Sequence, residues 1–132
     1  MSELFPQTQN IHLWSGPIYD LWDLFPSKSD EIEFLRQLRK LYYWPGEGLN
    51  GGQFVVGDLT CQAIPAMIGE RIYEVFVDDI IGTREHLRIV VWTGKQAGQI
   101  WILWILEKPE PKYTNEEIAF IRTRQAHCAE LA

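Results

Sequence analysis

The sequence has little cysteine. Its 132 residues contain only Cys61 and Cys128, too few for the disulfide framework of a small secreted protein, so we expect reduced thiols and a cytoplasmic location. The three histidines do not fall with the cysteines into any metal-ligand spacing. We therefore expect neither a metal ion nor another cofactor.

Long apolar runs are missing as well. The longest, residues 100–106, is far too short for a helix that crosses a bilayer. The first residues, M-S-E-L-F-P-Q, have neither the basic start nor the apolar core of a signal peptide. From these two absences we expect a protein that does not bind a membrane.

The chain also lacks an excess of basic residues. Its formal net charge is −6, whereas a domain that holds nucleic acid through the phosphates is usually basic. The deficit lies in residues 1–60, which carry four basic and eight acidic side chains, while residues 71–112 carry six of each. A nucleic-acid site would therefore depend on a few locally placed cations.

Apolar and aromatic residues, in contrast, are abundant. Apolar residues make up 46% of the chain and charged residues 23%, which is typical of a globular protein, and the length suits one domain spanning residues 1–132. The chain has six Trp, six Phe and five Tyr. A domain this small cannot bury all of these rings, and an exposed cluster of them would indicate a partner surface.

The N-terminal third is predicted to be mainly helical. Residues 8–14 are compatible with a short first strand. Apolar residues then recur at helical spacing from Ile18 to Phe25, and Pro26 ends that helix. A second helix follows, with Ser29 as its N-cap. Its buried stripe is predicted to contain Ile32, Leu35, Leu38 and Tyr42.

Residues 45–70 are predicted to be irregular. The glycine-rich stretch 45–52 lacks the Lys-Ser/Thr end of a phosphate-binding loop and follows no strand, so we interpret it as a flexible connection. Residues 53–70 are ambiguous, with a short helix or turn near residues 57–63 before Pro65.

The C-terminal half predicts a sheet followed by a helix. Three β-rich runs are predicted as strands: residues 72–77, 87–92 and 99–106. Short connections make neighbouring strands antiparallel, and Pro109 and Pro111 block further pairing. Thr114 caps a helix that runs to about His127. We expect an α+β fold in which N-terminal helices pack on one face of a three- to four-stranded antiparallel sheet, with a C-terminal helix closing the domain.

Short motifs in this half follow a recognisable order. Residues 71–77, R-I-Y-E-V-F-V, form a hydrophobic-Tyr-Glu-hydrophobic strand, and residues 86–92, H-L-R-I-V-V-W, place an arginine early in the next strand. Residues 102–118, I-L-W-I-L-E-K-P-E-P-K-Y-T-N-E-E-I, add a third strand, a Lys/Pro bend and a helix with an acidic start, while I-P-A-M at 64–67 precedes the first strand. From residue 30 to residue 127 the chain resembles the RelE/HigB superfamily of bacterial toxin–antitoxin ribonucleases.

The resemblance implies an mRNA interferase: a metal-independent endoribonuclease that cleaves mRNA, commonly in the ribosomal decoding site, and is inhibited by a cognate antitoxin protein. In such cleavage the RNA 2′-hydroxyl attacks the adjacent phosphate. The protein must therefore position the strand, neutralise charge and move protons. Cations together with Tyr or His side chains on one sheet face are sufficient for that.

The resemblance also assigns candidate catalytic residues. Arg88 matches the family's arginine at the start of the second long strand, which contacts the scissile phosphate. Lys108 falls near the family's cation after the third strand, a transition-state stabiliser, and Lys112 lies in the same bend. Tyr113 lies close to the family's C-terminal tyrosine, which helps to activate the nucleophile.

Other roles for these residues stay open. Glu74 and Phe76 stand where the family often has cations, and a carboxylate facing a phosphate site would repel RNA about as strongly as one cation attracts it. Arg88 could instead form a salt bridge with Glu74 or Glu85, and the two lysines and the tyrosine could be solvated loop residues. The alternative function is therefore a catalytically inactive RelE-fold protein that acts as a protein-interaction module.

Overall fold

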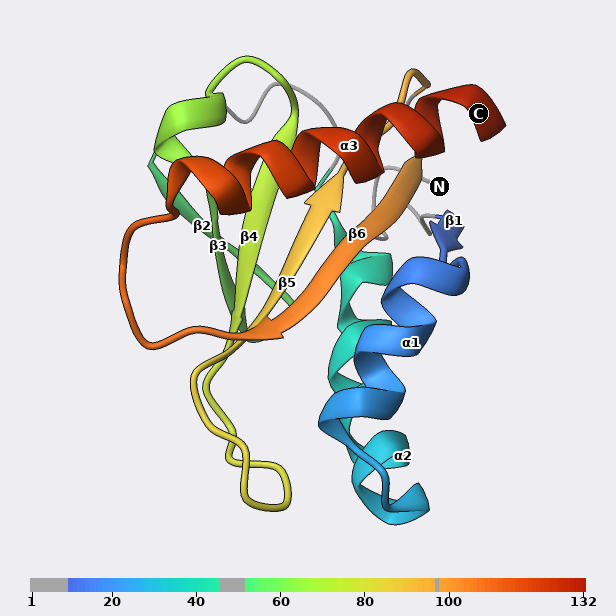
Figure 1. Ribbon diagram of the computed structural model, residues 1–132, viewed down its shortest axis with the longest axis vertical. Helices are drawn as coiled ribbons and strands as arrows, with labels where there is room; N and C mark the ends of the chain where they lie inside the picture. Colours follow the sequence, from blue (N-terminus) through green and yellow to red (C-terminus); the bar gives the residue numbers. More distant parts are fainter. Residues whose placement is uncertain (1–9, 46–51, 97) are drawn as a thin grey trace, which may run out of the picture.

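The computed structural model describes residues 10–45, 52–96 and 98–132. Helices and strands follow one another along the chain as Figure 1 shows. The elements are β1 (Asn10–His12), α1 (Ser15–Leu24), α2 (Lys28–Leu38), the 3-10 helix η2 (Arg39–Tyr43), β2 (Gln53–Val56), β3 (Leu59–Ala63), the 3-10 helix η3 (Pro65–Met67), β4 (Ile72–Val77), β5 (Leu87–Trp92), β6 (Gln99–Glu107) and α3 (Asn115–Leu131). The α+β class is confirmed.

The sheet is larger than the sequence predicted. It has six strands in the order β1-β6-β5-β4-β3-β2, and it is mixed because β1 runs parallel to β6. The expected three- to four-stranded antiparallel sheet is therefore wrong in number and in one orientation. The central strands β4, β5 and β6 are antiparallel and lie where the sequence placed them.

The additional hairpin comes from a segment that the sequence left ambiguous. β2 and β3 pair with Val56 opposite Leu59, so only Gly57 and Asp58 connect them. Gly57 has φ 64°, the left-handed backbone that two-residue hairpin turns require. The helix or turn predicted over residues 57–63 is thus a tight turn followed by a strand.

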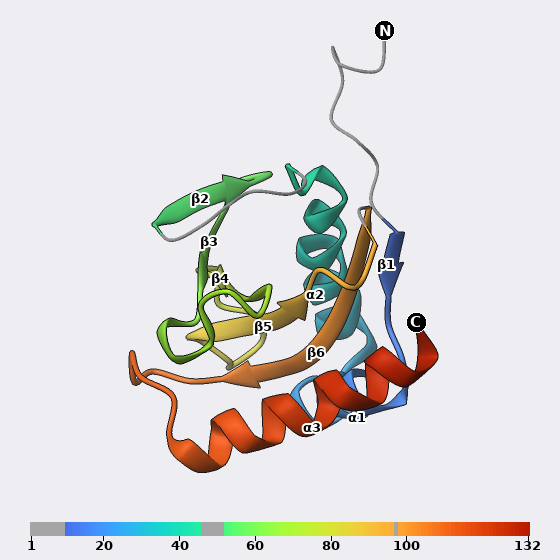
Figure 2. The same ribbon diagram turned by 90° about the horizontal axis from the view of Figure 1, so that it is seen from above.

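Helices cover both faces of the sheet, as Figure 2 shows for α2 and α3. One core packs α1 and α2 against residues such as Val75, Ile89 and Ile102. The other packs α3 and η3 against Val90 and Trp92 on the opposite face. The N-terminal helices α1 and α2 share one face, as expected, while α3 covers the opposite face, because β5 and β6 are apolar on both sides and each side needs a cover.

Helix boundaries were predicted less accurately than strands. Ser27, not Ser29, is the N-cap residue of α2. Ile32 is 43% exposed, while Phe34 is fully buried and contributes to the core instead. Thr114 does cap α3: its hydroxyl accepts from the Glu117 amide, and the Glu117 side chain accepts from the Thr114 amide in return.

Among the described residues, none of the helices is both long enough and apolar enough to span a membrane.

Candidate functional site

Arg88 lies on the α3 side of β5, where strand pairing places it between Phe76 of β4 and Leu106 of β6. Its guanidinium is buried, with 5% of the residue exposed. Nη1 donates to Glu74 Oε1 at 2.8 Å, and Nη2 donates to the Glu110 carbonyl at 2.8 Å. The salt bridge with Glu74 that the sequence left open is therefore present.

Glu74 faces Arg88 from the neighbouring strand β4. Glu74 is completely buried. Oε2 accepts a hydrogen bond from Gln62 Nε2 at 2.9 Å, so both carboxylate oxygens have partners. A buried charge in this position is stabilised by these bonds, and the pair as a whole is neutral.

Lys108 follows β6 directly and is also buried, with 5% exposed. Its backbone amide donates to the His86 carbonyl at 2.9 Å, and its Nζ donates to Glu117 Oε1 at 3.0 Å. It is not a solvated loop residue. Burial of Glu117 favours the neutral acid, but hydrogen bonds from the Thr114 amide and from Lys108 outweigh burial and lower the pKa of Glu117.

Tyr113 connects the two cations. Its ring centroid lies 5.5 Å from the Arg88 guanidinium carbon and 5.2 Å from Lys108 Nζ. The hydroxyl is buried and makes no hydrogen bond to the described residues. Burial raises the pKa of Tyr113, and the nearby Glu74 carboxylate raises it further. The raised pKa favours the protonated phenol, which can donate a hydrogen bond.

A polar cavity of about 390 Å³ opens beside this cluster. Its lining residues come from the ends of β4 and β5 and from the bend after β6: Phe76, Val77, Asp78, His86, Leu87, Arg88, Lys108 and Pro109. Arg88 and Lys108 thus share one cavity. Each is paired with one carboxylate, so the cluster around them adds little net positive charge.

His86 is a functional candidate that the sequence prediction did not include. Its backbone has φ 57°, in the left-handed region that non-glycine residues rarely adopt. The bond from the Lys108 amide to its carbonyl helps to hold this conformation. His86 lines the polar cavity with Arg88 and Lys108, and its Nε2 is 4.0 Å from Glu85 Oε1. The sequence feature that could have indicated His86 is its position two residues before Arg88.

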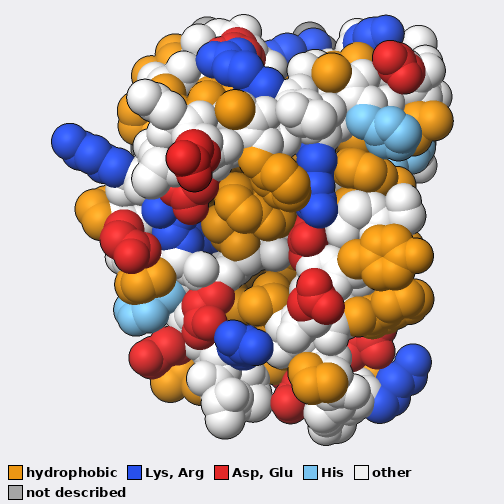
Figure 3. All heavy atoms as spheres, in the orientation of Figure 1, with side chains coloured by type: hydrophobic (Ala, Val, Ile, Leu, Met, Phe, Trp, Pro, Cys, Tyr) orange, Lys and Arg blue, Asp and Glu red, His pale blue; other side chains and the backbone are white. Residues whose placement is uncertain are grey.

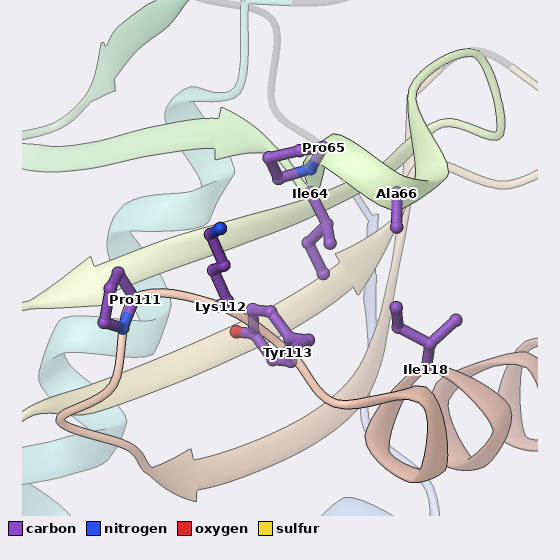
Figure 4. A pocket seen from close by; sticks show the side chains of 7 residues that line it. All are labelled: Ile64, Pro65, Ala66, Pro111, Lys112, Tyr113 and Ile118. Atoms are coloured by element: carbon purple, nitrogen blue, oxygen red, sulfur yellow. The ribbon is translucent and has the colours of Figure 1, made fainter.

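Lys112 does not join the other three candidates. Its side chain is exposed and, within the described part of the chain, forms no ion pair. It lines a second, apolar cavity of about 200 Å³, which Figure 4 shows. The lining residues of this apolar cavity are Ile64, Pro65, Ala66, Pro111, Lys112, Tyr113 and Ile118. The structure therefore brings Arg88, Lys108 and Tyr113 together and places Lys112 at the apolar cavity instead of the polar one.

Neither cysteine offers a reactive thiol. Both are buried, and burial raises the pKa of Cys61 to about 12 and that of Cys128 to about 11. In residues 10–45, 52–96 and 98–132, no group of three or more His, Cys, Asp or Glu side chains is arranged to hold a metal ion.

Comparison with known proteins finds no match: no family model, no curated protein and no solved structure matches this chain.

Proposed function

We propose that the protein is a RelE/HigB-like mRNA interferase whose polar cavity holds the scissile phosphate of RNA. The observation that carries this proposal is that His86, Arg88 and Lys108 line one cavity, with the Tyr113 ring against both cations. The order of two helices, a sheet and a closing helix also agrees with the resemblance.

The proposed reaction requires no metal. The RNA 2′-oxygen forms a bond to the adjacent phosphorus, and the bond from phosphorus to the 5′-oxygen of the next nucleotide breaks. The products are a 2′,3′-cyclic phosphate and a 5′-hydroxyl. The proton leaves the 2′-hydroxyl for a base, and an acid supplies one to the departing 5′-oxygen. Imidazole is suited to such transfers near neutral pH, and His86 is the cavity residue that carries one.

Arg88 retains hydrogen-bonding capacity for a phosphate despite its ion pair. A guanidinium has five N–H donors, and the bonds to Glu74 and to the Glu110 carbonyl use two of them. Lys108 adds a second positive charge at the same cavity. The paired carboxylates weaken the attraction for RNA, so we expect binding to depend on correct positioning more than on net charge.

Cleavage of RNA by the purified protein tests the proposal. We expect a labelled mRNA fragment, with or without ribosomes and in the presence of EDTA, to give cyclic-phosphate ends. His86→Ala and Arg88→Lys should lower the rate at least tenfold. Arg124→Lys is the matched control, because Arg124 is a half-buried arginine that is likewise paired with a carboxylate, away from the polar cavity. Absence of cleavage under every condition, or equal rates in the three variants, would refute the proposal.

A growth assay tests the biological role. Expression of the wild-type chain should arrest growth, and a cognate antitoxin protein encoded by the neighbouring gene should relieve the arrest. The Arg88→Lys variant should permit growth at an equal protein level. Normal growth with abundant, folded wild-type protein would contradict the toxin role.

A second candidate function rests on a different observation. Tyr19 and Trp22 on α1 are 61% and 53% exposed, and their rings are in edge contact at 5.6 Å. Such an exposed pair is typical of protein interfaces. A catalytically inactive interaction module would bind its partner normally in Arg88→Lys but lose about 2 kcal/mol or more of binding energy in Trp22→Ala. Calorimetry with the neighbouring gene product would separate the two functions.

A further inference from the structure

The apolar cavity lies between two segments that are distant in sequence, residues 64–66 and residues 111–118. Figure 4 shows Ala66 of η3 and Ile118 of α3 on one side and Pro111 of the bend on the other. Tyr113 lies between them, at the centre of the labelled group. A volume of about 200 Å³ is below the roughly 300 Å³ at which pockets for drug-sized ligands begin, so it suits one ring system rather than a whole ligand.

Tyr113 links the apolar cavity to the cations of the polar cavity. It lines the apolar cavity, and its ring contacts the Arg88 and Lys108 cations of the polar cavity at 5.5 and 5.2 Å. A ligand in the apolar cavity would therefore lie one aromatic ring away from the proposed phosphate position. This separation suits the neighbouring parts of one nucleotide chain.

The walls and the rim of the apolar cavity differ in chemistry. The rings of Pro65, Pro111 and Tyr113 provide flat apolar surfaces, on which a base can stack. Lys112 adds an exposed cation that forms no ion pair with a described residue. Charge is mixed elsewhere on this side of the molecule: Figure 3 shows acidic and basic side chains interspersed on the face that carries α3.

We propose that the apolar cavity binds one unpaired nucleobase of the RNA whose adjacent phosphate lies at Arg88 and Lys108, and that Lys112 contacts a flanking phosphate. This inference rests on the proposed ribonuclease function and names its substrate class, single-stranded RNA. Apolar stacking surface beside an unpaired cation fits a nucleotide, which is flat and apolar at the base and anionic at the phosphate. An apolar side chain of a protein partner would fill the cavity but would form no ion pair with Lys112.

The test is binding of a fluorescent RNA octamer with 2′-fluoro sugars, which lacks the attacking hydroxyl. Ala66→Phe fills the cavity from η3, and Ala119→Phe, an equal change on the exposed surface of α3, is the control. We expect Ala66→Phe to weaken binding about tenfold, as loss of one stacked base does, and Ala119→Phe to leave it unchanged. Lys112→Ala should reduce the slope of log affinity against log salt by about one.

A second measurement uses only the wild-type protein. Replacing single bases of the octamer by abasic residues should reveal one position whose loss costs about tenfold in affinity. Ala66→Phe should show no further loss at that position. Equal affinity for every abasic octamer, or for both phenylalanine variants, would overturn the nucleobase site.

The outcomes also separate this inference from the proposed function. If Arg88→Lys weakens RNA binding while Ala66→Phe does not, the phosphate site stands and the nucleobase site falls. If neither change affects RNA binding, both fall. If Ala66→Phe impairs binding of the neighbouring gene product but not of RNA, the cavity belongs to a protein partner and the inference is wrong.

Discussion

Two arginines in this protein, the buried Arg88 and the half-buried Arg124, have nearly the same surroundings. Each guanidinium contacts two aromatic rings, pairs with one carboxylate and donates to one backbone carbonyl. For Arg88 these groups are Phe76, Tyr113, Glu74 and the Glu110 carbonyl. For Arg124 they are Phe120, Trp14, Asp20 and the Leu103 carbonyl.

What lies beside each arginine differs. Asp20 accepts from Arg124 at 2.5 and 3.0 Å through both oxygens and also from the Ile105 amide at 3.2 Å, so the pair ties α1 and α3 to β6. Arg88 lines the polar cavity together with His86 and Lys108, whereas Arg124 lines neither cavity described above. A buried arginine pair is therefore not in itself a sign of function; the adjoining cavity is.

The largest expected effect is loss of stability at the structural pair. Asp20→Ala would leave Arg124 partly buried without its carboxylate and free the Ile105 amide. We expect the free energy of unfolding to fall by about 3 to 5 kcal/mol. Urea denaturation measures this change. A loss below about 1 kcal/mol would show that the pair does not hold α1 and α3 together.

Replacing the carboxylate partner of each arginine by a neutral amide tests the difference between Arg88 and Arg124 more directly. Glu74→Gln and Asp20→Asn each change the net charge from −6 to −5, so long-range effects on RNA are equal. We expect either change to lower stability by about 1 to 3 kcal/mol, since a charge-assisted bond becomes weaker. Only Glu74→Gln should tighten RNA binding, about fivefold at low salt, because it removes a carboxylate beside the proposed phosphate position. Anisotropy titrations over a range of salt concentrations would measure the RNA affinity of both variants. If both variants bind RNA equally more tightly, net charge alone explains the effect.

Much of the sheet could be predicted from the sequence because its signals are local. Alternating and continuous apolar runs located β4, β5 and β6, and the Thr114 cap with Glu117 located the start of α3. The β2–β3 hairpin was not predicted, because the feature of the sequence that marks it is a two-residue turn at Gly57. The placement of α3 opposite α2 follows from the need to cover both faces of the sheet, which depends on how all the strands are assembled.

Contacts in the candidate site could be predicted only where the pairing of neighbouring strands by itself brings two side chains together. Glu74 and Arg88 lie on the same sheet face of neighbouring strands, so their salt bridge could be anticipated. The burial of Lys108 could not, because Glu117 reaches it from the first turn of α3. Arg124 pairs with a residue 104 positions away, and no local pattern indicates such a contact.

Lys108 gives the Arg88 region a second ion pair, and the described residues form no counterpart to it at Arg124. The lowered pKa of Glu117 means that the unfolded chain binds a proton more tightly than the folded one. Its stabilising contribution is therefore present above the ordinary carboxyl pKa of 4.5 and is lost as pH falls through the lowered value. Glu117→Gln should flatten this part of the plot of unfolding free energy against pH. The exposed neighbour Glu116→Gln is the control, and identical curves would contradict the pairing.

The smallest expected effect comes from removing one ring at each arginine. Phe76→Leu and Phe120→Leu each delete one cation–π contact, at 5.1 and 4.4 Å, while the second ring stays in place. We expect each to lower the free energy of unfolding by about 0.5 to 1 kcal/mol. RNA affinity should separate them, because Phe76 lines the polar cavity and lies against the guanidinium that we propose to contact phosphate, whereas Phe120 lies against an arginine that joins helices to the sheet. An equal loss of RNA affinity in both variants, measured by anisotropy, would mean that the cavity is not what distinguishes the two arginines.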